Sequence, residues 1–477
     1  MRGQPTAWAF RYGVLCGYVF GWATTWSIAE MGARYFGLSL PLAVVAFASY
    51  YLVVCGMPFG IFAAGTAVLL RSPDPGRAGL LISLLWVATE FLRGRLIGQP
   101  WALLGYTQHD HVALIQVAAC TGVYGVSFLL ALGGTALAEA AWRWRAGRGT
   151  RDVLRPLVVP GTLVAACYAG GVLCVGPSST DGLFERQVAV VQTNLSPARH
   201  WTRSYTQAQL LAHLRATDAL PATTHPALIV WPENAVPRYL EAEPILAVDL
   251  GDLALRHGAD LLFGGPRSEA GKVYNSARLI TADGRNGGYY DKRRLVLFAE
   301  EKPLAWAAHR APNDSPEEFS SGAGTGVLQS FVPLGVSICH EITHPDLIAQ
   351  SVWNGAELLV NIANDGWLDA GQGFAGRQHL AMAVFRAVET RRYLVRAATT
   401  GTSAVVDPYG RLIGSLPPGT AGVLTTPVVG RRTLTPYVRL GDLFALACAG
   451  IAAAALVGQP RQLAQRRRSP PRVPAAS

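Results

Sequence analysis

The sequence has little charge for its length. Only 15% of its 477 residues are Asp, Glu, Lys or Arg, whereas 50% are hydrophobic. A soluble globular chain usually carries about 25% charged residues, so this composition argues against a purely cytosolic protein. It also excludes a disordered chain, which needs low hydrophobicity and high charge. The length indicates two or three structural units.

Patterns that would bind a metal, a nucleotide or a nucleic acid are also missing. No Cys/His spacing resembles a zinc site, and no Gly-rich phosphate loop follows a strand pattern. The net charge is +10, but the arginines flank apolar runs and form no basic face with interleaved aromatics. The charge therefore favours membrane orientation over nucleic-acid binding.

What the chain does have is long apolar runs. A membrane-spanning helix needs about 20 mostly apolar residues. Runs of this kind predict six spans: Trp8–Ala29, Ser39–Leu70, Ala78–Ile97, His111–Trp142, Pro156–Gly176 and Leu440–Val457. The second and fourth exceed one span, and Pro58 and the Gly133-Gly134 pair are candidate breaks. Buried helices of a soluble core are the alternative, which so many long runs disfavour.

The arginines predict the orientation of these spans. Basic residues lie before the first run, between the second and third, between the fourth and fifth, and after the last. If every run crosses once, these segments share one side, which is cytoplasmic, and the region before the last run lies outside. Arg93 and Arg95 fall near the other side, where Glu90 could pair with Arg93 at i,i+3.

Residues 183–435 have the composition of a soluble domain. Short β-branched runs predict strands at Gln187–Gln192, Ala227–Trp231, Asp260–Gly264, Tyr274–Ile280, Gly335–Ile338, Leu358–Ile362, Leu394–Ala397 and Thr402–Val406. Helices are expected at Tyr205–Leu220, Pro244–His257, Pro345–Asn354 and Gly373–Glu389. Apolar strands that alternate with helices predict an α/β sheet buried on both faces. The expected organisation is therefore helices over 1–180, this domain, a last helix over 438–458 and a basic cytoplasmic tail over 459–477.

Cys339 is the only cysteine outside the apolar runs, so it has no disulfide partner within the soluble domain. It ends an apolar strand and precedes a helix entrance, His340–Pro345. We expect an exposed, reactive thiol whose pKa is lowered by the helix N-terminus. An ordinary buried cysteine is the alternative.

A carboxylate and a cation could serve such a thiol. Glu233 follows the strand at Ala227–Trp231, at the carboxyl end where α/β proteins bind ligands. Lys292 lies in a mixed charged and apolar stretch. Each has a plain alternative, a solvated loop carboxylate and a surface lysine. Together with Cys339 they supply the base, the oxyanion-stabilising cation and the nucleophile that attack on an acyl carbon requires.

This set, in this order, resembles the Glu-Lys-Cys triad of the nitrilase superfamily of carbon–nitrogen hydrolases, whose known architecture is an αββα sandwich. The membrane context narrows the resemblance to the apolipoprotein N-acyltransferase family. The segments that carry it are Thr89–Gly94, Trp231–Pro237, Lys292–Glu300, Ile338–Glu341, Asn361–Trp367 and Gln378–Glu389. By that resemblance the domain is inserted before the last helix of an all-α transmembrane bundle, and the chain begins at the family's third span.

The resemblance implies roles for individual residues. Glu233 is the general base, Lys292 the oxyanion cation and Cys339 the nucleophile. Supporting or substrate-binding positions are Glu300, Glu341, Trp201, His340, Asn364 and Asp365. Trp201 corresponds to an aromatic residue near the path of the lipid. Three departures concern substrate handling: His340 replaces a tyrosine, Leu297 and Ala299 replace Pro and Gly, and Leu368-Asp369 replace Phe-Gly.

The implied reaction is ping-pong acyl transfer through a thioester, without metal or organic cofactor. The donor is a membrane phospholipid, and the acceptor is the α-amine of a diacylglyceryl-cysteine at a lipoprotein N-terminus. The resemblance also implies a monomer in a bacterial inner membrane, with the catalytic domain outside the cytoplasm. Two alternatives are a membrane-tethered amidase or nitrilase and an inactive paralogue that acts as a scaffold. The apolar stretch Val296–Asn313 favours a lipid substrate over a small polar one.

Overall fold

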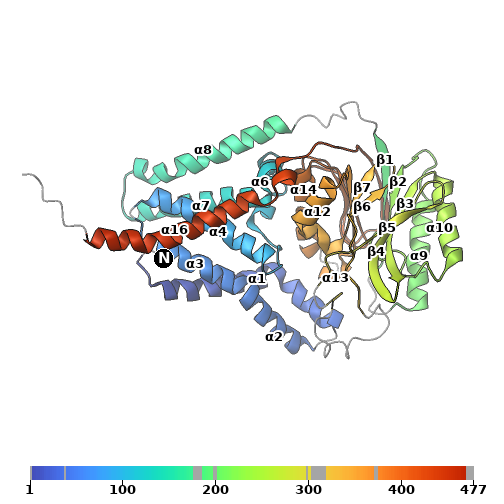
Figure 1. Cartoon of the computed structure of the whole chain (residues 1–477), viewed down its shortest axis with the longest axis horizontal. Coiled ribbons are helices and arrows are strands. Elements are labelled where there is room, and N and C mark those ends of the chain that lie inside the picture. Colours follow the sequence, from blue (N-terminus) through green and yellow to red (C-terminus); the bar gives the residue numbers. More distant parts are fainter. Residues whose placement is uncertain are drawn as a thin grey trace, which may run out of the picture.

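The computed structural model describes residues 3–36, 39–72, 74–175, 185–196, 201–296, 299–301, 318–369 and 374–468, with the side chains of 27–36, 369 and 459–468 left out. Helices gather at one end of the molecule and two β-sheets at the other (Figure 1). The helical end contains α1 (Thr6–Phe36), α2 (Leu40–Tyr51), η1 (Leu52–Gly56), α3 (Met57–Leu69), α4 (Pro75–Arg95), η2 (Leu104–Gln108), α5 (Val112–Ile115), α6 (Ala118–Thr121), α7 (Val123–Arg145), α8 (Thr150–Cys174), α15 (Pro436–Leu440) and α16 (Leu443–Arg468).

Three of the described helices are long and apolar enough to cross a membrane: Leu40–Leu69, Val123–Arg145 and Thr150–Cys174. The expectation of a membrane protein is confirmed at this level. The other three predicted spans fall on helices α1, α4 and α16. The number of spans stays a prediction.

The two long runs behave differently at their candidate breaks. The run at 39–70 continues through the π-helical turn η1, which ends two residues before Pro58. The run at 111–142 does not break at Gly133-Gly134, which lies inside α7, so that expectation is wrong. It breaks at Gly122, whose φ of +64° ends α6 before α7 begins. A left-handed backbone interrupts a helix, whereas glycines with helical angles do not.

The α/β end contains two six-stranded sheets, ordered β12-β1-β2-β3-β4-β5 and β11-β10-β9-β8-β7-β6. The strands of the first are β1 (Arg186–Gln192), β2 (Leu228–Val230), β3 (Asp260–Glu269), β4 (Lys272–Ile280), β5 (Asn286–Asp291) and β12 (Gly422–Val428). Those of the second are β6 (Val327–Gln329), β7 (Pro333–Ile338), β8 (Leu358–Ala363), β9 (Leu394–Ala398), β10 (Ser403–Val406) and β11 (Leu412–Leu416). The central strands are parallel, and the outer pairs are antiparallel.

Helices cover both outer faces of this pair of sheets. Side chains of α9 (Arg203–Asp218) and α10 (Pro244–His257) pack on the first sheet. Those of α12 (Pro345–Trp353) and α14 (Phe374–Thr390) pack on the second, and a third apolar cluster fills the space between the sheets. The short η3 (Cys339–Thr343) and α13 (Gly366–Asp369) complete the domain. The predicted αββα sandwich before a last helix is confirmed.

The layer of α12 and α14 is also the contact with the helical end. One apolar cluster joins Phe385 of α14 to Val87 of α4, Val123 of α7 and Cys448 of α16. Arg95 adds a polar link, because it bonds both Asp346 of α12 and Asp442. Both outer faces of the sandwich are therefore covered, one by its own helices alone and one by helices that also contact the bundle.

Arg93 and Glu90 bond to backbone groups rather than forming the expected i,i+3 pair. Arg93 donates to the carbonyl of Ala102 (3.2 Å), and Glu90 accepts from the backbone N–H of Leu104 (2.7 Å). These charges lie where α4 meets the segment that follows it.

Candidate active site

The three residues expected to carry the chemistry lie where strands end. Glu233 follows β2, Lys292 follows β5 and Cys339 follows β7, so both sheets contribute. The Lys292 Nζ lies 3.6 Å from Glu233 Oε1. Glu233 is 5% exposed and Lys292 1% exposed, which excludes a solvated loop carboxylate and a surface lysine. The structure therefore brings together groups that are far apart in sequence.

A second carboxylate shares the ammonium of Lys292. Glu300 Oε1 accepts from Lys292 Nζ at 2.8 Å, and Glu300 Oε2 accepts from the backbone N–H of Val296 at 2.9 Å. Asn275 Nδ2 donates to Glu233 Oε1 and to Glu300 Oε1, each at 2.8 Å. The amide and the ammonium thus hold two buried carboxylates side by side.

The turn that carries Glu233 needs a glycine on the neighbouring strand. A Cβ on Gly264 of β3 would lie 2.6 Å from the Glu233 Cα and 2.7 Å from the Asn234 nitrogen. Asn234 itself has a φ of +55°, in the left-handed region that favours glycine. The close approach of β3 fixes this turn, and with it the position of the carboxylate.

Cys339 also has a left-handed backbone, with a φ of +51°. Such a conformation is unfavourable for a residue with a Cβ unless its surroundings hold it. The carbonyl of Cys339 lies 3.1 Å from His379 Nε2 and accepts from Asn361 Nδ2 at 3.4 Å. The side chain is half-buried, at the start of η3.

Glu341 braces the cysteine turn against the lysine segment. Its Oε2 accepts from the backbone N–H of Ile338 (2.8 Å). Its Oε1 accepts from the backbone N–H groups of Arg293 (2.7 Å) and Arg294 (3.1 Å) and from the Tyr290 hydroxyl (2.8 Å). All the bonds described for this carboxylate join parts of the protein, so we assign it a supporting position.

The expected lowering of the Cys339 pKa is wrong. Burial, followed by the negative charge of Glu233, raises the pKa of the Cys339 thiol well above its usual range. The turn after Cys339 is a 3-10 helix of five residues, too short for its dipole to offset burial. The thiol is therefore neutral at rest and needs a base.

The charged groups around the thiol can supply such a base. Burial raises the pKa of Glu233, and the charge of Lys292 opposes this. Burial alone would lower the pKa of Lys292, but Glu300 and Glu233 raise it above its usual range. Lys292 is thus a fixed cation, and Glu233 is a carboxylate whose raised pKa makes it a stronger base.

The remaining predicted positions differ in what surrounds them. His340 packs its ring on His344, with centroids 5.0 Å apart, and burial lowers its pKa well below the usual range. The ring is therefore neutral and adds no charge beside the thiol. Asn364 places its backbone N–H toward the Cys339 sulfur, and its buried Oδ1 has no partner among the described residues.

Asp365 and Trp201 complete the set. Asp365 is buried and pairs with Arg396 (2.6 Å) and His379 (2.9 Å), which hold its pKa below the usual range although burial opposes this. Trp201 is half-buried just before α9, and no hydrogen bond or ring contact joins it to the triad among the described residues. Its role stays a prediction. Most of the stretch 296–313 lies outside the described residues.

Sequence reasoning missed Asn275, His379 and Arg396. Asn275 lies in a predicted strand, at a position that faces inward between apolar residues. A polar residue at such a position was the signal that could have identified it. His379 lies in a segment that carries the family resemblance, Gln378–Glu389, and Arg396 lies on a predicted strand, but the sequence pattern assigns neither side chain a role.

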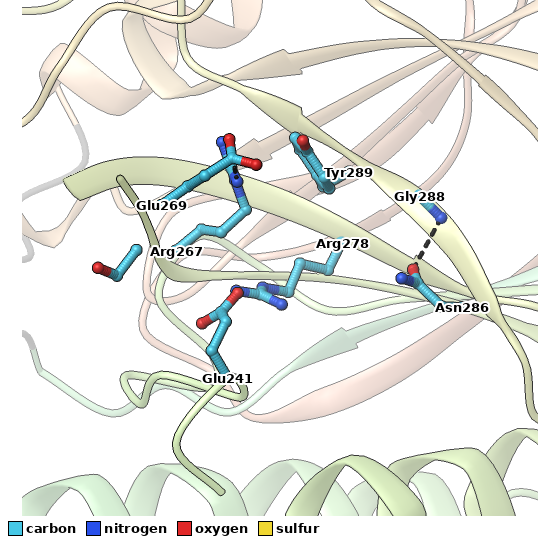
Figure 2. A pocket seen from close by; sticks show the side chains of 8 residues that line it. Glu241, Arg267, Glu269, Arg278, Asn286, Gly288 and Tyr289 are labelled. Carbon is cyan, nitrogen blue, oxygen red and sulfur yellow. Dashed lines mark hydrogen bonds and ion pairs between the residues drawn. The ribbon is translucent and has the colours of Figure 1, made fainter. Parts of the chain in front are cut away.

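A cavity of about 240 Å³ lies on the outer face of the first sheet, apart from the triad (Figure 2). Its charged groups are paired: Arg267 with Glu269, and Arg278 with Glu241. Arg267 also forms two bonds to Asp291 (3.0 and 2.6 Å), the residue before Lys292. The bonds of Arg267 on this face therefore hold the end of β5, the strand that leads to Lys292. Within the described residues, no group of three or more His, Cys, Asp or Glu could hold a metal ion.

Two family models match different parts of the chain. The family model "Carbon-nitrogen hydrolase" matches residues 187–436, and "Apolipoprotein N-acyltransferase N-terminal domain" matches residues 2–136. An amidase of the nitrilase superfamily from Nesterenkonia AN1, solved as a cysteine-to-alanine mutant, aligns over 57% of this chain and 99% of its own, with 18% identity and a TM-score of 0.43.

Two relatives match most of the chain. The apolipoprotein N-acyltransferase of Geobacter metallireducens is 36% identical over 86% of this chain and 79% of its own length. That of Methylococcus capsulatus is 34% identical over 92% and 86%. The fold, the site and the match to the carbon–nitrogen hydrolase model together define the class of this protein. It is a carbon–nitrogen hydrolase domain joined to a helical bundle. Within that class, the chain belongs to the apolipoprotein N-acyltransferase family.

Proposed function

We propose that this protein transfers an acyl chain from a membrane phospholipid, through a thioester on Cys339, to the α-amino group of the N-terminal diacylglyceryl-cysteine of lipoproteins. The observation that carries the proposal is the grouping of the buried Glu233 and Lys292 with the half-buried Cys339, in a domain that packs on helices able to cross a membrane. Family membership supports the same reaction.

In the first half-reaction, Glu233 takes the thiol proton and the sulfur attacks the ester carbonyl carbon. Lys292 stabilises the oxyanion that forms. The carbon–oxygen bond then breaks, and Glu233 returns the proton to the leaving oxygen, which releases a lysophospholipid. The acyl chain remains on Cys339 as a thioester.

In the second half-reaction, the α-amino nitrogen attacks the thioester and the carbon–sulfur bond breaks. Glu233 takes a proton from the nitrogen and passes it to the departing sulfur, which restores the thiol. The same base and cation serve both steps, so the reaction needs no additional group.

We further propose six spans, a catalytic domain over 183–435 on the extracytoplasmic side of the inner membrane, and a monomeric enzyme. The arginine clusters between the apolar runs support this orientation. Arg95 falls near the proposed outer side, where its charge is compensated by Asp346 of α12 and by Asp442.

The experiment is mass spectrometry of a synthetic diacylglyceryl-cysteine peptide. The peptide is incubated with the detergent-purified protein and a phospholipid of defined chains. We expect a mass gain of one acyl chain on the α-amine, and none with Cys339→Ala.

An unmodified peptide, with the Geobacter metallireducens relative active under the same conditions, would contradict the proposal. The intact mass of the protein then separates the alternatives. An acyl adduct on Cys339 indicates a live nucleophile with another acceptor, such as water in a membrane-tethered hydrolase. No adduct indicates a scaffold.

A further inference from the structure

The backbone of the nucleophile is held by a residue without an assigned role. The left-handed Cys339 directs its carbonyl toward His379 on α14, with the Nε2 3.1 Å away. A carbonyl oxygen only accepts hydrogen bonds, so the Nε2 must carry a proton and donate it. This contact requires a hydrogen on Nε2, whether or not Nδ1 is also protonated.

The far side of the ring is held equally closely. His379 Nδ1 lies 2.9 Å from Asp365 Oδ1 and 3.0 Å from Arg396 Nη2. Arg396 also bonds Asp365 at 2.6 Å and the side-chain oxygen of Asn361. That bond orients the Asn361 side-chain amide, whose nitrogen donates to Ser337 (3.1 Å) and to the Cys339 carbonyl (3.4 Å). The whole cluster is buried, so the imidazole has a single orientation.

The residue next to His379 contacts the helical bundle. Gln378 Nε2 donates to the carbonyl of Thr24 in α1 at 3.1 Å, and Gln378 Oε1 accepts from Trp101 Nε1. Thr25 has non-helical angles inside α1 (φ −140°, ψ 23°), so α1 is kinked where Gln378 binds. The Trp101 ring also lies 5.6 Å from the His379 ring. Two adjacent side chains of α14 thus contact the nucleophile turn and the kink of α1.

We propose that His379 is a positioning residue for Cys339, and that Gln378 makes this positioning depend on the docking of α1. The proposal rests on the proposed function only in taking Cys339 as the nucleophile. His379 points at the backbone of Cys339 and not at its sulfur, so it takes no proton in the reaction. Its donor holds the turn in the conformation that presents the sulfur between Glu233 and the substrate.

The test compares two replacements of His379. Glutamine can place its Nε2–H where the histidine Nε2–H lies, whereas leucine fills space without a donor. Since misplacing a reacting group by about 1 Å can cost about 100-fold, we expect His379→Leu to lower kcat for acyl transfer by about that factor. KM for the phospholipid should stay within about twofold, and His379→Gln should recover most of the loss.

A buried histidine elsewhere is the control. His213 in α9 bonds the carbonyl of Gln209 and packs on Trp231, without contact to Cys339. His213→Leu should lower thermal stability while kcat stays within about twofold. Gln378→Leu should lower kcat by about tenfold, because His379 then loses its tie to α1.

Alkylation separates this proposal from the proposed function. The rate at which iodoacetamide modifies Cys339, followed by peptide mass spectrometry, needs no lipid substrate. We expect it to fall in His379→Leu and to be restored in His379→Gln even if no acyl transfer is found. Wild-type kcat and alkylation in a folded His379→Leu variant, or a folded His379→Gln variant as impaired as the leucine one, would overturn the proposal.

Discussion

Two carboxylates share one ammonium near the Cys339 thiol, so small changes in their hydrogen bonds alter the pKa of Glu233, the proposed base. Glu233 and Glu300 both accept from Asn275, and Lys292 pairs with both. A donor that bonds the charged form of a carboxylate lowers its pKa. Asn275 therefore sets how much of Glu233 is available as a base at neutral pH.

Replacing Asn275 by leucine should move the acidic limb of the pH–rate profile. Burial already raises the pKa of Glu233, and the loss of the amide donor raises it further. Since Glu233 must be deprotonated to accept the thiol proton, the acidic limb moves to higher pH and the rate below it falls. Single-turnover acyl-enzyme formation across pH measures this.

An asparagine on the adjacent strand gives the control for that profile. Asn286 is exposed on β5, where it accepts from the Gly288 backbone. Asn286→Ala should leave both limbs in place. An acidic limb that does not move in a folded Asn275→Leu protein would show that the amide does not act on Glu233.

Glu341 is expected to matter for stability at least as much as for activity. Glu341→Ala leaves three backbone N–H groups and the Tyr290 hydroxyl without their acceptor. Each buried group left unsatisfied costs about 1–3 kcal/mol, so the loss should reach at least about 3 kcal/mol. Thermal unfolding in detergent measures it. Asp218→Ala removes an exposed carboxylate and should change stability by less than about 1 kcal/mol.

At the scale of elements, the strands that were predicted and those that were missed occupy different places. The eight predicted strands are the interior ones, and the four missed strands, β5, β6, β11 and β12, are the four sheet edges. Interior strands are buried on both faces and read as continuous apolar runs. Edge strands have one neighbour, and theirs include polar and glycine residues, as in Asn286-Gly287-Gly288. Their pairing depends on the sheet and not on their own pattern.

The packing of α1 on the α2–α3 segment depends on glycines at a spacing of four. A Cβ on Gly13 would lie 2.5 Å from the Phe59 carbonyl oxygen, and one on Gly17 would lie 2.4 Å from that of Cys55. Small residues allow helices within a membrane to approach this closely. The same helix contacts Gln378, so its position matters to the active site.

Gly17→Ala should therefore destabilise the bundle by about 1–3 kcal/mol, since the helices must separate to accept the methyl group. The matched control is Gly133→Ala in α7, where a Cβ would meet nothing within 4 Å. There alanine should be neutral or stabilising by up to about 1 kcal/mol, because it favours helix over glycine. Thermal unfolding of both variants in one detergent makes the comparison. Equal losses at the two sites would contradict the close-packing argument.

At the scale of the whole molecule, α14 joins the two parts of the protein. Its inner side packs on the second sheet, and its other contacts reach α1, α7 and Trp101 (Figure 1). The catalytic domain is therefore held by several helices of the bundle at once.

The proposed orientation can be tested by labelling. With the exposed Cys16, Cys120 and Cys174 and also the half-buried Cys339 replaced by serine, Lys272→Cys reports on the catalytic domain and Arg148→Cys on the loop after α7. A membrane-impermeant maleimide should label Lys272→Cys in spheroplasts and Arg148→Cys only after permeabilisation. Labelling in the reverse order would place the catalytic domain in the cytoplasm.

The sequence by itself determined the apolar runs, the central strands, the covering helices and the set of Glu233, Lys292 and Cys339. These are local properties, because burial on both faces and short motifs leave their pattern in consecutive residues. Only the tertiary structure decided the edge strands, the raised pKa of the thiol, and the partners Asn275, His379 and Gln378. Burial and hydrogen bonding arise from residues brought together from distant parts of the chain, and no local pattern records which of them meet.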